Sequence, residues 1–153
     1  MDTIILQLCM AFLGSLGFAL IFGLRRALLV PASVGGLISW AIYLLCSSFM
    51  AGVFVPCLIA SAFSALYAEL LARVLKAPVT LFFLPAVVPL IPGSTLYYAM
   101  SGVVQGNMDA ARSYASLTVQ YALAISAGMS LVWAFCVMAS RLRKSRHESS
   151  GSK

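Results

Sequence analysis

Five long apolar runs dominate the chain, and short polar segments separate them. A helix needs about 20 apolar residues to cross the hydrocarbon core of a bilayer. The runs are too long and too continuous for the alternating strands of a membrane barrel. We therefore predict an all-α, polytopic membrane helix bundle with five crossings, at about residues 4–24, 27–46, 51–72, 78–104 and 114–139.

The fourth run contains three prolines and a glycine near its middle. Proline removes a backbone donor and clashes with the preceding turn, so Pro89, Pro92 and Gly93 predict a broken fourth helix. We expect Ser94 or Thr95 to cap a second half-helix. Its free N–H groups and positive dipole end would then lie near the membrane midplane and suit a carboxylate. The alternative is a structural kink with ordinary packing.

Composition excludes a soluble domain. The chain is 62% hydrophobic and 9% charged, whereas a soluble domain carries about a quarter charged residues. A domain of 153 residues has too much surface to fold in water with so few charged side chains. The formal charge of +6 lies in short groups between the apolar runs, which indicates membrane orientation and no nucleic-acid partner.

The basic residues also predict the orientation. With five crossings, Arg112 falls on one side of the membrane and nine other basic residues fall on the opposite side: Arg25, Arg26, Arg73, Lys76, Arg141, Arg143, Lys144, Arg146 and Lys153. Positive charge stays in the cytoplasm, so we expect the N-terminus outside and the C-terminus inside. Residues 1–140 would form the membrane domain, and 141–153 a basic, disordered cytoplasmic tail near the lipid surface.

Glu69 and Arg73 stand one helical turn apart at the end of the third run. One interpretation is a weak, partly solvated ion pair at the interface. The other is a gate or a proton-coupling carboxylate, because ionisable groups at membrane edges often mark pathways.

Small residues recur every four positions in the fifth run and form one stripe, which predicts close helix packing: Thr118, Ala122, Ser126, Ser130 and Ala134. The alternative is the polar lining of a conduit.

The chain lacks the residues that most chemistry requires. Its four cysteines are isolated, and its single histidine, His147, lies in the charged tail, so we expect no metal and no cofactor. No nucleophile and base stand together, which disfavours an enzyme. No charge lies near the centre of a run, so another chain would supply any coupling group there.

Two segments resemble the threonine/serine exporter family, in its small C-terminal-type half. They are Ala68–Pro78, which contains Glu-x-x-x-Arg, and Val88–Gly93, which contains Pro-x-x-Pro-Gly and is followed by Leu96, Tyr97 and Met100. The resemblance covers essentially the whole chain in length and in the pattern of crossings, and its specific part is residues 68–100.

The resemblance implies a two-component exporter in the bacterial inner (plasma) membrane. Its substrates would be threonine and serine, or dicarboxylates such as succinate. The partner would be a larger five-helix subunit with a soluble N-terminal part, related to this chain as an inverted repeat; membrane lipid and a second copy are further partners. Candidate substrate-binding residues are Pro89, Pro92, Gly93, Ser94, Thr95 and Tyr97. The alternative is a non-transporting scaffold subunit.

Overall fold

The structure, a computed structural model, describes the backbone of residues 2–150 and the side chains of residues 3–140. Every regular element in this part of the chain is helical, which confirms the all-α prediction. In chain order, the elements are α1 (Asp2–Ile21), α2 (Arg26–Phe49), α3 (Phe54–Leu75), α4 (Thr80–Val87), the 3-10 turn η1 (Val88–Leu90), α5 (Gly93–Val104) and α6 (Met108–Ser150).

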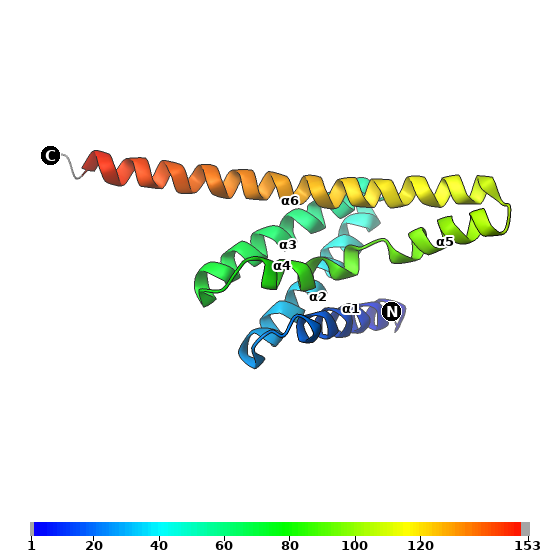
Figure 1. Cartoon of the computed structure of the whole chain (residues 1–153), viewed down its shortest axis with the longest axis horizontal. Helices are drawn as coiled ribbons and strands as arrows, with labels where there is room; N and C mark the ends of the chain where they lie inside the picture. The colour runs from blue at the N-terminus through cyan, green and yellow to red at the C-terminus, as the bar shows by residue number, and fades with distance from the viewer. Residues whose placement is uncertain (1, 151–153) are drawn as a thin grey trace.

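Four stretches of helix are long and apolar enough to cross a membrane: Thr3–Ile21, Arg26–Phe49, Phe54–Leu75 and Met108–Ser140. The remaining pair, Thr80–Leu90 and Gly93–Val104, passes the same test together and bends by 52° at the break. In Figure 1, α5 leads away from α4 toward the α5–α6 turn and does not fold back. The pair thus follows the course of one broken crossing, which brings the count to five.

The short helix α4 lies at the centre of the bundle. It packs against α1, α2 and α3, and η1 packs against the same three helices. Phe82 and Ala86 are completely buried, and Leu90 is nearly so. A helix that is apolar on all sides must be surrounded, and the sequence Thr-Leu-Phe-Phe-Leu-Pro-Ala-Val meets this condition.

Glycine in α2 permits the close approach of α1 and α4. A Cβ atom at Gly36 would collide with the Ser15 hydroxyl of α1 and lie 3.1 Å from the Pro85 carbonyl oxygen of α4. A Cβ at Gly35 would lie 2.7 Å from the ring of Tyr67 in α3. Small residues at such crossings are the usual means by which membrane helices pack, since lipid offers no hydrophobic driving force between helices.

The last helix differs from its prediction at both ends. It begins at Met108 because the Asn107 Oδ1 atom accepts a hydrogen bond from the Ala110 N–H at 3.1 Å, which caps the helix. Its backbone stays helical to Ser150, where the sequence predicts a disordered tail. Residues 151–153, and the five tail side chains in the charge count, lie outside the described part.

The predicted packing stripe of α6 makes little contact within this chain. Of its members only Thr118 is partly covered, and Ala122, Ser126, Ser130 and Ala134 are exposed. A neighbouring face makes the contact with α3, where a Cβ at Gly128 would lie 2.8 Å from the Leu58 carbonyl oxygen. A spacing of exactly four drifts around a helix of 3.6 residues per turn, so the stripe leaves the contact face.

We expect Gly36→Val to destabilise the fold, since added methyl groups at a tight contact cost about 1–3 kcal/mol. The melting temperature in detergent, followed by fluorescence-detected size exclusion, should fall. Gly14→Val is the matched control, because a Cβ at Gly14 in α1 meets no atom within 4 Å. Equal melting temperatures for the two variants would contradict the close approach.

Candidate functional site

Proline chemistry produces the break in the fourth crossing. Pro89 has no N–H group, so the Pro85 carbonyl loses the donor that an α-helix would supply four residues later. The chain tightens into η1, where the Ile91 N–H donates to the Val88 carbonyl at 3.1 Å. Pro92 then stands as the residue before α5. The predicted interruption at Pro89, Pro92 and Gly93 is therefore confirmed.

The predicted side-chain cap is wrong. Helix α5 begins at Gly93, so Ser94 and Thr95 lie inside its first turn, and the preceding residue makes no side-chain capping bond. The Thr95 hydroxyl instead donates back to the Pro92 carbonyl at 3.1 Å. It also accepts a hydrogen bond from the Thr118 hydroxyl of α6 at 2.9 Å, which ties the start of α5 to the last crossing.

The first turn of α5 is open. Within residues 2–150, the N–H groups of Ser94 and Thr95 donate no hydrogen bond, while those of Gly93 and Leu96 donate to the carbonyls of Ile91 and Pro92. Gly93 and Ser94 are exposed, and a Cβ at Gly93 would meet no atom within 4 Å. Free N–H groups and the positive end of the helix dipole can therefore receive a small anion here.

The other candidate residues lie farther from the open first turn of α5. Pro89 is half-buried in η1. Tyr97 follows Gly93 by one turn on the same face, and its side chain is 67% exposed. Its ring packs on that of Tyr98 at a centroid distance of 5.5 Å. The structure therefore brings Pro92, Ser94 and Thr95 together, and leaves Tyr97 one turn away.

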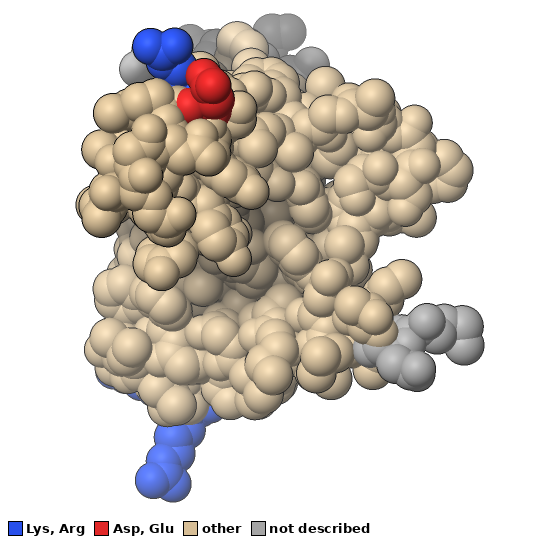
Figure 2. All heavy atoms as spheres, turned by 90° about the vertical axis from the view of Figure 1, so that its right-hand side faces the viewer, with Lys and Arg blue, Asp and Glu red and all other residues tan. Residues whose placement is uncertain are grey.

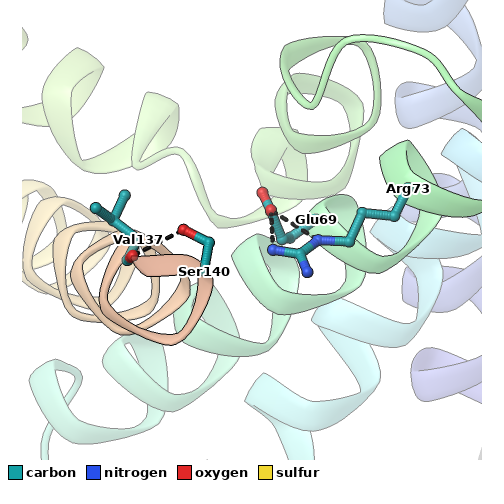
Figure 3. Close-up of polar contacts among 4 residues, drawn as sticks. All are labelled: Glu69, Arg73, Val137 and Ser140. Atoms are coloured by element: carbon teal, nitrogen blue, oxygen red, sulfur yellow. Dashed lines mark hydrogen bonds and ion pairs between the residues drawn. The ribbon is translucent and has the colours of Figure 1, made fainter. Parts of the chain in front are cut away.

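Glu69 and Arg73 form an ion pair within α3 (Figure 3). The Nη2 and Nε atoms of Arg73 both donate to Glu69 Oε1, at 2.8 and 3.1 Å. The arginine side chain is 56% exposed and the glutamate 22%. Because both residues belong to one helix, the pair by itself does not join two elements that could separate.

Glu69 nevertheless lies where three helices meet. It lines a small void of about 50 Å³ with Phe83 of α4 and with Met129, Trp133 and Cys136 of α6. This void and the break lie at opposite ends of the segment Thr80–Leu90, roughly 16–18 Å apart at helical rises. Glu69 and the break are thus two separate positions, one at each end of the central helix.

The two membrane faces differ in charge. Seen from the α5–α6 turn, the surface is hollowed below these two helices and carries few charged side chains (Figure 2). Asp109 and Arg112, in the first turns of α6, belong to this end of the molecule. The turns between α1 and α2 and between α3 and α4 carry Arg25, Arg26 and Lys76 at the opposite end.

Comparison with known families completes the description. Residues 7–135, most of the chain, match the family "Threonine/Serine exporter, ThrE". The chain belongs to the threonine/serine exporter family. It is thus a multi-pass membrane component of that exporter class, and membership favours a transport role over an enzymatic one. No curated protein and no solved structure matches the chain.

In this exporter-family chain, sequence reasoning missed several buried polar residues. Ser39 and Ser64 share a hydrogen bond of 2.7 Å between α2 and α3. The hydroxyl of Ser15 and the indole nitrogen of Trp40 are buried without a partner in the described part of the chain. Serine recurs throughout the apolar runs, so only the helix packing tells which hydroxyls are enclosed.

Proposed function

We propose that the chain is the small subunit of a two-component exporter of small carboxylate-bearing metabolites in the bacterial inner membrane. The observation that carries this proposal is the open start of α5, in the middle of the broken crossing. There the N–H groups of Ser94 and Thr95 donate no hydrogen bond within residues 2–150, and Gly93 and Ser94 are exposed. Interrupted helices of this kind form the midplane substrate sites of many transporters.

The geometry supports a carboxylate as the recognised group. The N–H groups of Ser94 and Thr95 would donate to its oxygens, and the helix dipole would favour its negative charge. The Ser94 hydroxyl is exposed beside them and offers a further donor. Threonine and serine are the proposed substrates, and dicarboxylates such as succinate are the alternative class.

A larger five-helix partner with a soluble N-terminal part is the second element of the proposal. Two exposed surfaces of the chain support the presence of a partner subunit. In the part of the chain that the structure describes, the substantial contacts of α5 are with α6. The small residues Ala122, Ser126, Ser130 and Ala134 are exposed along α6, and such stripes are typical of helix–helix interfaces in membranes. A second copy of the chain is the competing occupant.

The proposed orientation places the N-terminus outside and the C-terminus in the cytoplasm. It rests on Arg25, Arg26, Arg73 and Lys76 at one end of the bundle, against Arg112 at the other. An odd number of crossings then makes the chain one half of an inverted pair with its partner.

For Glu69, the geometry favours coupling over a gate. A gate formed by an ion pair must join two elements, and the ion pair with Arg73 lies within α3. Glu69 also lines the void between α3, α4 and α6, so a change in its charge would act next to the central helix. We place proton coupling at Glu69, with Arg73 as the residue that positions its carboxylate.

We expect Gly93→Leu to slow export strongly without loss of folding. The new side chain has room within this chain but covers the free N–H groups, and losing a charged hydrogen bond should slow export of threonine and serine by about tenfold or more. Export from cells that lack the native gene is measured by mass spectrometry of the medium. The variant is expressed with and without the larger subunit.

Gly14→Leu is the control, since that position in α1 is equally open. Wild-type export rates per assembled Gly93→Leu complex would contradict the substrate site and favour a scaffold. Full export by the wild-type chain alone would contradict the obligate partner.

We expect Glu69→Gln to weaken the dependence of export rate on an imposed pH gradient, because the amide cannot carry a proton. The side chain keeps its shape and lies near the interface, so the melting temperature should change little. Asp109→Asn, which neutralises a carboxylate at the opposite end of the bundle, should retain the full pH dependence. An unchanged pH response in Glu69→Gln would exclude this residue from coupling.

A further inference from the structure

A pocket of about 490 Å³ opens at the basic end of the bundle, between the α1–α2 turn and the α3–α4 turn. We call it the basic pocket. Arg25 and Lys76 line it, together with aliphatic residues that include Leu24, Leu28, Leu75 and Leu81. Its volume falls in the range of ligand-binding pockets, roughly 300–1,000 Å³. It is separate from the break and from the void at Glu69, which have other lining residues.

The charge of the basic pocket comes from side chains. Helices α2 and α4 begin there and α1 and α3 end there, so their dipoles oppose one another and largely cancel. No acidic residue lines the pocket. Among the side chains of residues 3–140, the one ion pair is Glu69–Arg73, so Arg25 and Lys76 have no acidic partner there. The pocket therefore has a net attraction for anions.

The backbone at Lys76 is a second, independent observation. Lys76 is the one non-glycine residue with positive φ within residues 2–150, with φ 51°. It ends α3 in the left-handed conformation, and its N–H donates to the Ala72 carbonyl. Glycine is the usual residue at this position, because a side chain adds strain. A lysine here places a positive charge in the pocket despite that strain.

The residues that line the basic pocket favour an amphiphile over a free anion as its ligand. The pocket lies where α1 and α3 end and α2 and α4 begin, which is the level of the membrane surface for helices that span it. Two cations stand beside leucine walls. A small soluble anion would gain nothing from those walls, whereas a phospholipid brings both a phosphate and acyl chains. We propose that the basic pocket binds the phosphate headgroup of an anionic phospholipid, with Arg25 and Lys76 as its ligands.

Native mass spectrometry of the purified protein tests this proposal. Short-chain phosphatidylglycerol should bind more tightly than phosphatidylcholine of the same chain length. Each basic residue near an anionic headgroup contributes about fivefold to affinity, so Arg25→Gln/Lys76→Gly should bind phosphatidylglycerol about twenty-fivefold more weakly. Arg112→Gln, at the opposite end, should bind as the wild type does.

The single variant Lys76→Gly distinguishes loss of lipid binding from loss of folding. Glycine suits the left-handed conformation, so its lipid-free melting temperature should equal or exceed that of the wild type while phosphatidylglycerol binding falls about fivefold. Unchanged binding in both variants would overturn the proposal, as would equal binding of phosphatidylcholine. Displacement of the lipid by an equal concentration of inorganic phosphate would also overturn it and would assign the pocket to soluble anions.

Discussion

The need to satisfy backbone hydrogen bonds inside a bilayer governs this structure. Lipid offers no donors or acceptors, so an interrupted helix is tolerated only where protein, water or a ligand meets the freed groups. Pro89 and Pro92 remove two donors within one crossing. The chain forms the 3-10 turn η1 there and begins a new helix at Gly93. The elements before the break, α4 and η1, are enclosed by α1, α2 and α3, whereas after it the N–H groups of Ser94 and Thr95 donate no hydrogen bond within residues 2–150. This asymmetry is the basis of the substrate site that we propose at the start of the second half-helix.

The break is also the joint between two packed parts. On one side, α4 is enclosed by the first three helices through the Gly36 contact. On the other side, the Thr95–Thr118 hydrogen bond holds α5 to α6. Glu69 lies at the far end of α4, against α6. The short helix α4 thus connects the region around Glu69 to the break.

Hydropathy and proline positions were sufficient to predict the crossings and the break, because both follow from local backbone chemistry and apolar length. The cap and the packing stripe were not predictable in this way. Ser94 and Thr95 are good capping residues, but Gly93 starts the helix and moves them into its first turn. Ala122 and Ser126 look like packing residues, but the face that meets α3 is selected by Gly128 and its neighbours. Contacts between helices, including the Ser39–Ser64 hydrogen bond, depend on the rotation of each helix about its own axis. The periodicity of the sequence alone does not determine that rotation.

Substrate protection of a cysteine at the break tests the central claim most directly. The four native cysteines are replaced by alanine, Ser94→Cys is introduced, and the assembled exporter is treated with a membrane-impermeant, water-soluble thiol reagent. We predict that the new cysteine reacts and that threonine, serine or succinate slows its modification, while the matching alcohol or amine without a carboxylate does not. An unreactive cysteine, or one modified at the same rate with every carboxylate present, would contradict a substrate site at the start of α5.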